Sequence, residues 1–382
     1  MPEGGAGEGP RIRRGLAEVY FDRSRITEID GRNGELRYRG YAIGELVEQA
    51  SFEETAWLLI HGELPTPGEL AGFDAALREA RELPAAVVDV LRSQTGAHPM
   101  DALRTAVSAL AAHDPERADA GREAVVRKGT RLLAQSATLV AAHHALRSGR
   151  EPARPDAGLA FADNLLFMLR GEKPGERDAR ILERDLILHA DHDANASAFT
   201  ARVVTGAQAD LHAAVTAALA AFAGPLHGGA VEGVMAMVEE IGEPERVAEY
   251  VRARRARREP IPGFGHRVYR TEDPRAAPMR AIARELAART GQQRWYAIFE
   301  ELVEAMKPYA RHGVDVNVDF YAGAVYRMLG IPRDLAVPLF AVGRVAGWVA
   351  QVLEQSERNI LIRPRLRYEG SAARPFVPLA ER

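Results

Sequence analysis

Two polar stretches in the last third of the chain hold side chains that could do chemistry on carbonyl groups. The first, residues 265–275, contains an imidazole at His266 together with several arginines and an aspartate. The second, residues 317–321, places Asp319 between apolar residues, where burial would raise the pKa of its carboxyl toward that of a useful general base. A histidine that polarises a carbonyl, arginines that bind carboxylates and a desolvated aspartate favour making or breaking a carbon–carbon bond within a small polyanion.

A third polar segment, Leu188 to Ser197, holds two histidines between apolar stretches. His189 and His192 are spaced i, i+3, so on a helix they would share a face and could bind a metal ion together with Asp191 or Asp193. Alternatively, the imidazoles donate hydrogen bonds to a carbonyl or carboxylate ligand, or form a purely structural buried network. The pattern alone leaves these three interpretations open.

His227 stands in a turn of small residues, GPLHGGA, that leads into an apolar helix. The first N–H groups of that helix would disfavour an imidazolium, so a neutral ring is expected. A neutral imidazole can still donate one hydrogen bond to a developing enolate oxygen. The alternative is a turn histidine that only bonds the backbone.

Arg344 lies inside an apolar helix, where an unpaired guanidinium is very costly and requires an anion. That anion could be a carboxylate of the protein or of a bound substrate. Arg363 stands near the C-terminus beside Pro364, on a stiffened segment. Together with Arg275, these residues could bind a dicarboxylate.

Composition narrows the class of protein. The 382 residues are 47% hydrophobic, enough for a large core, and the net charge of −3 with interspersed signs gives no field that favours nucleic acid. Without cysteine there are no disulfides and no thiolate nucleophile. From the sequence, we expect no apolar run that approaches the ~20 residues of a membrane span. Residues 1–14 indicate a disordered tail rather than a signal peptide, so a cytoplasmic location is expected.

The elements that must position these side chains are mostly helices. A hairpin is predicted around the turn Asp30–Gly34, and Ser51 with Glu54 is typical of a capping box that opens a helix. Beyond Tyr41 the helical period dominates, which predicts an all-α protein. The further helices are predicted at 68–82, 101–113, 119–148, 156–170, 209–222, 228–241, 243–258, 277–290, 292–311, 321–330 and 333–356. Gly343 and Gly347 would let another helix approach closely, and the run 252–258 (RARRARR) indicates either a solvated basic face or a phosphate site.

In combination, these motifs resemble citrate synthase of the short, dimeric type, over about residues 15–370. The resemblance is carried by IDG…LRYRGY, SFEE…HGELP, HPMD, the histidine-rich loop, GPLHGGA, GHRVYR-x-x-DPRA, NVDFYAG and the late arginines, all in family order. The longer bacterial form, a hexamer inhibited by NADH, has an extra N-terminal region that this sequence does not match. The family fold implies a nearly all-helical homodimer with a small β-hairpin, a large domain at 15–217 plus 322–382, and a small domain at 218–321.

The resemblance also implies a role for each matched residue. Asp319 would remove a methyl proton from acetyl-CoA, His227 would stabilise the enol, and His266 would bind the carbonyl of oxaloacetate. The expected oxaloacetate ligands are His189, His192, Arg275, Phe340, Arg344 and Arg363, the last reaching across the dimer interface. The expected CoA contacts are Ile261, Pro262, Gly263, Phe264, Gly265 and Arg270. No metal or other cofactor is expected, and no nucleic acid or membrane partner.

Three rival functions share parts of this pattern. A 2-methylcitrate synthase would use propionyl-CoA, and one methylene is worth only ~1–3 kcal/mol of discrimination. A catalytically silent CoA- or carboxylate-binding protein is disfavoured because His227, His266 and Asp319 are all present. A metallohydrolase built on His189 and His192 would lose activity to a chelator.

Overall fold

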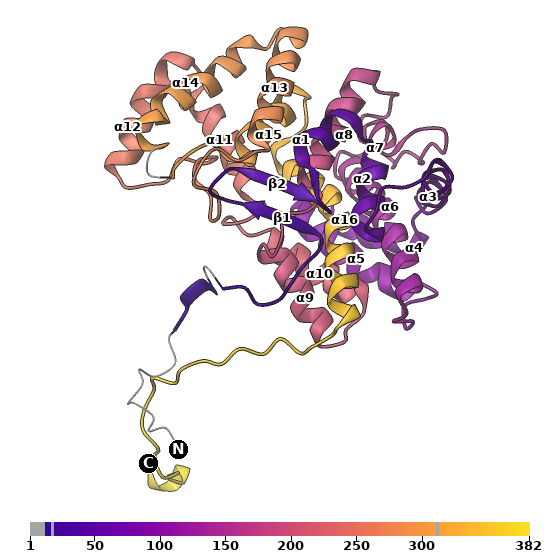
Figure 1. Cartoon of the computed structure of the whole chain (residues 1–382), viewed down its shortest axis with the longest axis vertical. Coiled ribbons are helices and arrows are strands. Elements are labelled where there is room, and N and C mark those ends of the chain that lie inside the picture. Colours follow the sequence, from indigo (N-terminus) through magenta and orange to yellow (C-terminus); the bar gives the residue numbers. More distant parts are fainter. Residues whose placement is uncertain (1–11, 17–18, 311–312) are drawn as a thin grey trace.

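The computed structural model describes residues 12–16, 19–310 and 313–382, and it is helical almost throughout (Figure 1). The prediction of an all-α protein is confirmed. The predicted tail falls mostly outside the described residues; its described part, 12–14, is exposed. The elements are β1 (Thr27–Asp30), β2 (Glu35–Tyr38), β3 (Tyr41–Ala42), α1 (Ile43–Gln49), α2 (Phe52–His61), α3 (Pro67–Glu79), α4 (Ala85–Ser93), α5 (Pro99–Leu110), α6 (Arg122–Arg147), α7 (Phe161–Arg170), α8 (Glu176–His189), α9 (Ala196–Gly206), α10 (Leu211–Phe222), α11 (Ala230–Ile241), α12 (Val247–Ala256), α13 (Ala276–Thr290), α14 (Gln293–Ala310), α15 (Val318–Met328) and α16 (Ala336–Glu357).

The N-terminal hairpin is present and has one more strand than predicted. β1 and β2 pair antiparallel from Thr27 opposite Tyr38 to Asp30 opposite Glu35, and β3 extends the sheet by pairing with β2. The Asp30 carboxylate closes the turn by accepting hydrogen bonds from the backbone N–H groups of Arg32 and Asn33. In Figure 1 this sheet lies between two groups of helices: a larger one around α16 and a second one formed by α11 to α15.

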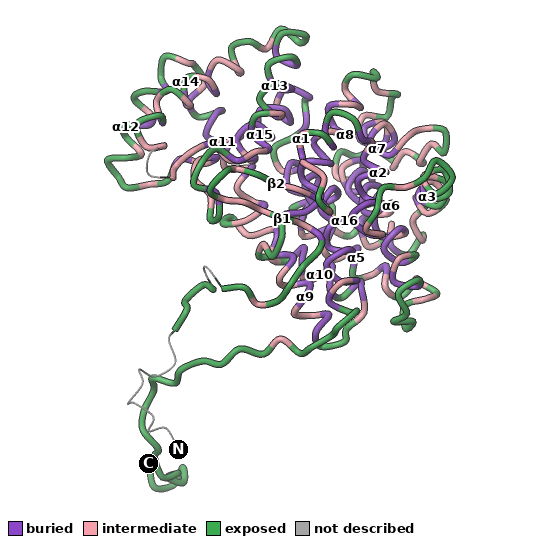
Figure 2. The backbone as a smooth tube through the Cα atoms, viewed as in Figure 1, coloured by how far each residue is buried: buried purple, intermediate pink, exposed green. Residues whose placement is uncertain are grey.

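The central helix, α16, is buried around its whole circumference (Figure 2). The segment Arg333–Glu357 is long and apolar enough to cross a membrane, so the expectation that no apolar run reaches the length of a membrane span was wrong. Its most apolar stretch, however, is entirely buried inside the protein. The prediction of a close approach at Gly343 is confirmed. A Cβ placed there would lie 3.0 Å from the Leu186 carbonyl oxygen of α8.

Helices α11 to α15 form a second group beside the larger one that is built around α16 (Figure 1). The predicted domain boundary at 321/322 falls inside α15, which is one continuous helix. The division into two domains therefore stays a prediction.

Local sequence explains where several helices begin. The capping box at Ser51 is confirmed: its side chain accepts from the Glu54 N–H, and Glu54 accepts from the Ser51 N–H. Three helices, α4, α8 and α9, were not predicted from the helical period. The helix predicted from residue 156 begins instead at Phe161.

The basic run at the end of α12 forms a solvated face with local partners. Arg254 and Arg257 both pair with Glu259, and the Arg255 guanidinium lies 4.3 Å from the centre of the Tyr309 ring. A phosphate-binding role for this face stays untested.

Beyond α16 the chain leaves the helical body as an extended segment that is exposed to the end (Figures 1 and 2). Large apolar side chains along it are turned to solvent: the exposed fraction is 98% for Leu366, 78% for Tyr368 and 81% for Phe376. Exposing these apolar side chains to water does not stabilise an isolated chain, and such exposure is typical of a surface that contacts another molecule.

Candidate active site

The structure brings most of the predicted site residues together between α8, α16 and the loops around them. The rings of His192 and His266 lie 5.2 Å apart between centres, and the His189 ring lies 3.8 Å from that of Phe340. The Arg344 guanidinium lies 5.1 Å from the centre of the Phe340 ring. Side chains from segments that are far apart in the sequence therefore lie close together.

Arg363 is the predicted site residue that the structure leaves apart. It lies on the exposed segment after α16 and has no ion pair among the described residues. Within one chain it does not contribute to this site.

His266 is held by the turn that follows it. Its Nδ1 accepts hydrogen bonds from the backbone N–H groups of Val268 (3.0 Å) and Tyr269 (3.1 Å). Since a backbone N–H can only donate, we assign the ring proton to Nε2. Burial, with the Arg275 charge nearby, lowers the pKa of His266 to about 4. At neutral pH the ring is thus an uncharged donor.

His227 is also neutral, as the sequence predicted, but the causes are burial and a nearby charge. Burial, followed by the nearby Arg344 charge, lowers its pKa to about 3. Its Nε2 lies 2.9 Å from Ser197 Oγ and 3.3 Å from the Ser197 N–H, so we assign Nε2 as the acceptor and Nδ1 as protonated. Trp348 donates to the same Ser197 Oγ at 3.1 Å. The predicted turn histidine therefore has a supporting network.

Asp319 lies in the first turn of α15, and its carboxylate makes no hydrogen bond with the described residues. Burial raises its pKa to about 7, although the nearby Arg275 charge acts in the opposite direction. A carboxylate with this pKa and free lone pairs can accept a proton near neutral pH. The expectation from the flanking apolar residues agrees with this environment.

The two buried arginines have different partners. Arg275 forms a two-point ion pair with Asp273, through Nε at 2.9 Å and Nη2 at 2.7 Å, so Nη1 remains available. Burial would lower the pKa of Arg275, but the Asp273 carboxylate raises it. Arg344 donates Nε to the His189 carbonyl oxygen at 2.5 Å and forms no ion pair with the described residues. Burial lowers the pKa of Arg344 to about 10.

The sequence left open whether the anion for Arg344 belongs to the protein or to a ligand, and the structure favours a ligand. Asp191 is the carboxylate that raises its pKa most, but Asp191 is bonded instead to Thr27, Gln351 and the Asp193 N–H. Both Nη groups of Arg344 are thus unused by the described side chains. A ligand carboxylate would satisfy them.

The histidine-rich segment does not form the helical pair that a shared metal would need. α8 ends at His189, so His192 leaves the helix and its Nε2 lies 3.2 Å from the Tyr269 hydroxyl. His189 Nδ1 lies 3.1 Å from Asp185 Oδ1, although the two atoms are not aligned for a hydrogen bond. Tyr326 donates to the other Asp185 oxygen at 2.5 Å. Among the described residues, no group of three or more histidines and carboxylates is placed to hold a metal ion.

The loop predicted to contact CoA is set against the start of α15. Gly265 N–H donates to the Asp315 carbonyl oxygen at 2.7 Å, and Asn317 N–H donates to that of Gly263 at 3.0 Å. Gly263 and Gly265 both have positive φ, and a Cβ on Gly263 would lie 2.7 Å from the Phe320 ring. The exposed Arg270 side chain lies beside Gly313. Ile261, Pro262 and Phe264 complete this loop, here called the CoA ledge (261–265), and the Phe264 ring lies 4.9 Å from that of Phe320 in α15.

Several residues that shape the site were not predicted. Tyr269 stands within the GHRVYR motif, yet only the structure shows its contact with His192. Asp185 and Tyr326 come from α8 and α15, and no local pattern pairs them. Phe222, whose ring lies 4.8 Å from that of His227, carried only the helical period as a signal.

Comparison with known proteins places this arrangement in a family. Residues 15–365 match the family model described as "Citrate synthase, C-terminal domain". The chain is 43% identical to citrate synthase 2 of Bacillus subtilis, covering 97% of this chain and 99% of that protein. It is 41% identical to 2-methylcitrate synthase 2 of Corynebacterium glutamicum, covering 97% and 98%.

A solved structure extends the comparison to the fold. Citrate synthase from Thermoplasma acidophilum, solved as a ternary complex with carboxymethyl coenzyme A and oxaloacetate, superposes on this chain with a TM-score of 0.93 at 31% identity. The match covers 97% of this chain and all of that one. Because the family model, the curated relatives and the fold agree over nearly its whole length, this chain belongs to the citrate synthase family.

Proposed function

We propose that this protein condenses acetyl-CoA with oxaloacetate and water to give citrate and CoA. The observation that carries the proposal is the free carboxylate of Asp319, with a pKa of about 7, beside two neutral imidazoles and two buried arginines. This set matches the demands of an enol-forming condensation, because a thioester C–H is a weak acid whose proton leaves only when the resulting oxygen is stabilised.

Each residue then has a role in the steps. Asp319 takes a methyl proton from acetyl-CoA while the His227 Nδ1–H donates to the thioester oxygen, which gives the enol. The methyl carbon attacks the ketone carbon of oxaloacetate, the enol proton returns to His227 as the thioester carbonyl re-forms, and His266 gives its Nε2 proton to the ketone oxygen. The proton held by Asp319 then replaces the one that His266 lost. Water then cleaves the C–S bond of the citryl thioester and releases CoA and citrate.

The arginines and the remaining histidines would bind oxaloacetate. Arg344 has two free Nη groups, and Arg275 has Nη1, so together they can hold two carboxylates. His192 would contribute from beside His266, and His189 and Phe340, whose rings are in contact, would complete the binding group. The ledge at 261–265 and Arg270 would bind the nucleotide end of CoA.

The proposed assembly is a homodimer in which Arg363 completes the partner's oxaloacetate site. The support is the exposed apolar segment after α16, which needs a covering surface, and the position of Arg363 on it. A cytoplasmic location stays a prediction from the sequence, and no cofactor is proposed.

The test is thiol release from acetyl-CoA and from propionyl-CoA, each with oxaloacetate at matched concentrations. Strong preference for acetyl-CoA is the expected result. Comparable or faster release from propionyl-CoA would make the chain a 2-methylcitrate synthase, and no release from either would overturn the proposed reaction.

A further inference from the structure

The small sheet touches both of the loops that carry the oxaloacetate histidines. One loop, 190–193, follows α8 and contains His192, whereas the other, 266–272, contains His266 and lies before α13. The sheet is distant from both in the sequence and contributes no residue to the proposed chemistry. Its contacts with the two loops therefore need their own explanation.

The strands hold the first loop by two hydroxyl groups, one on the half-buried Thr27 and one on the buried Tyr38. Thr27 of β1 donates to the Asp191 carboxylate at 2.5 Å. Tyr38 of β2 donates to the Asp191 carbonyl oxygen at 2.9 Å, and its oxygen lies 3.2 Å from the Asp191 N–H. The residue next to His192 is thus bound through its side chain and its backbone.

The hairpin turn holds the second loop by contacts that only glycine permits. The Arg270 N–H donates to the Gly31 carbonyl oxygen at 2.8 Å. A Cβ on Gly31 would lie 2.5 Å from the Val268 carbonyl oxygen, and one on Gly34 would lie 2.8 Å from Thr271 Oγ1. The turn and the loop are therefore in direct backbone contact.

The contact at Val268 connects the turn to the imidazole of His266. Val268 faces Gly31 with its carbonyl oxygen and donates its N–H to His266 Nδ1 at 3.0 Å. Any displacement of Val268 therefore changes the position of the ring that would bind the ketone. The two loops also meet directly, through the contact between the Tyr269 hydroxyl and His192 Nε2.

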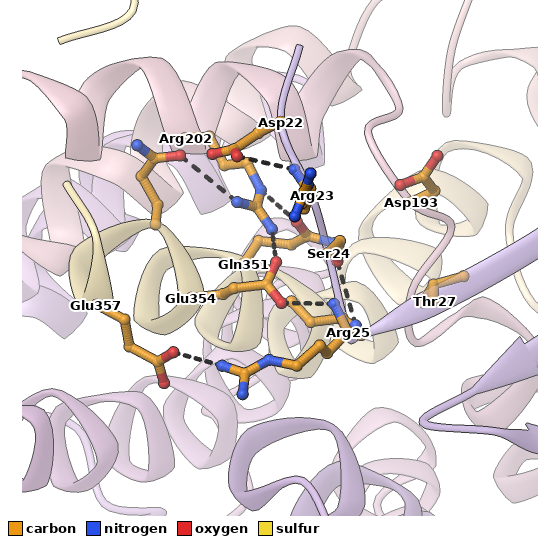
Figure 3. A network of polar contacts seen from close by, with 12 residues as sticks. Asp22, Arg23, Ser24, Arg25, Thr27, Asp193, Arg202, Gln351, Glu354 and Glu357 are labelled. Carbon is orange, nitrogen blue, oxygen red and sulfur yellow. Dashed lines mark hydrogen bonds and ion pairs between the residues drawn. The ribbon is translucent and has the colours of Figure 1, made fainter. Parts of the chain in front are cut away.

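The start of the sheet is fixed to the central helix, so it can act as a rigid support (Figure 3). The Arg25 N–H donates to Glu354 Oε1 at 2.7 Å, and its guanidinium pairs with Glu357 at 2.6 Å. Gln351, on the same helix, donates to the Asp191 carboxylate at 3.2 Å. The helix, the sheet and the first loop form one connected unit.

We propose that Thr27, Tyr38 and the turn 30–34 act as a sheet clamp, which fixes the distance between the His192 and His266 loops and thereby sets the affinity for oxaloacetate. This inference rests on the proposed function. The residues of the sheet clamp are positioning residues, because they act on the substrate only through the two loops. The CoA ledge is bonded to 315–317 rather than to the sheet, and of the proposed CoA contacts only Arg270 touches the turn, through its backbone N–H. The clamp should therefore affect acetyl-CoA binding much less than oxaloacetate binding.

The experiment compares Gly31→Ala with Gly44→Ala in the full-length protein. Neither glycine has a positive φ, and a Cβ on Gly44 would meet nothing within 4 Å, so it is a matched control. We expect Gly31→Ala to weaken oxaloacetate binding about tenfold by calorimetry without acetyl-CoA, in line with the cost of overpacking. The KM of Gly31→Ala for acetyl-CoA should stay within about twofold of wild type. For Gly44→Ala, the oxaloacetate affinity and the KM for acetyl-CoA should both stay within that range.

A second pair of variants tests the other side of the clamp without adding bulk. Thr27→Val removes the hydroxyl that binds Asp191, and Thr105→Val removes one that only bonds its own helix. We expect Thr27→Val to weaken oxaloacetate binding and Thr105→Val to leave it unchanged. Oxaloacetate affinity equal to wild type in both Gly31→Ala and Thr27→Val would overturn the clamp. The clamp would also be overturned if these variants lowered the melting temperature but left the oxaloacetate affinity and the KM for acetyl-CoA unchanged, because that result indicates a merely structural role. A wild-type protein that releases no thiol would instead overturn the proposed function.

Discussion

Replacing Asp319 by asparagine should abolish condensation and, at the same time, stabilise the fold above neutral pH. A pKa of about 7 against an ordinary 3.8 means that ionising this carboxyl in the folded protein costs about 4 kcal/mol more than in the unfolded chain. The side chain keeps some contact with water, so about 2–4 kcal/mol is expected in practice. Asparagine has nearly the same shape and carries no charge at any pH.

The sign of the effect follows from proton binding. Below pH 3.8 the carboxyl is protonated in both states and contributes no difference. Between pH 3.8 and about 7 the folded state keeps the proton that the unfolded chain has lost, so wild-type stability falls as pH rises. Above about pH 7 the loss is complete. The stabilisation by asparagine therefore grows across this window and then levels off.

The assay is denaturant unfolding of both proteins at pH 5, 6, 7 and 8.5, at one fixed protein concentration because a dimer's stability depends on it. Calorimetry with oxaloacetate at pH 8 serves as the control, and the variant should keep near-wild-type affinity. A difference in unfolding free energy that does not change with pH would refute the raised pKa. Near-full turnover by the variant would refute the role of Asp319 as the base.

Three further outcomes are expected. Arg344→Ala should weaken oxaloacetate binding by ~2–5 kcal/mol in calorimetry, and an unchanged affinity would assign Arg344 a structural role. Co-refolding Arg363→Ala with Asp319→Ala should restore about a quarter of wild-type activity. Half of the dimers would pair the two variants, and one of the two sites in each such dimer would carry neither defect. No recovery would place Arg363 outside the partner's site. Turnover should survive dialysis against a chelator, since the proposed steps use only side chains, and its loss would revive the metal interpretation of His189 and His192.

The sequence was most informative where one residue's chemistry depends on its immediate neighbours. The capping box at Ser51 and the hairpin turn at Asp30 form from groups within four residues, so their patterns predicted them directly. His227 and Asp319 were identified as candidates because the small residues around one and the apolar residues around the other describe their environment. These local inferences agree with the structure, while the catalytic roles themselves stay predictions.

Residues that depend on distant partners could not be predicted in the same way. The helical period missed α8, whose charged first half masks the apolar face that packs against α16, and so the pairing of Asp185 with His189 one turn apart was missed too. α9 contains Thr and Val, which are neutral to unfavourable in helices, and its formation depends on packing against α10 and α16. Gly31 gave no sign of its contact, because Val268 lies far away in the sequence.

The position of α16 at the end of the chain also has a consequence for synthesis. Helices α2, α5, α6, α8, α9 and α10 pack on it, yet residues 336–357 leave the ribosome after all of them. At ~5–20 residues per second, the earlier helices wait on the order of tens of seconds for their common partner. During that time their apolar faces depend on one another or on chaperones. A chain that stops before residue 336 should therefore remain sensitive to protease, however complete its earlier helices are.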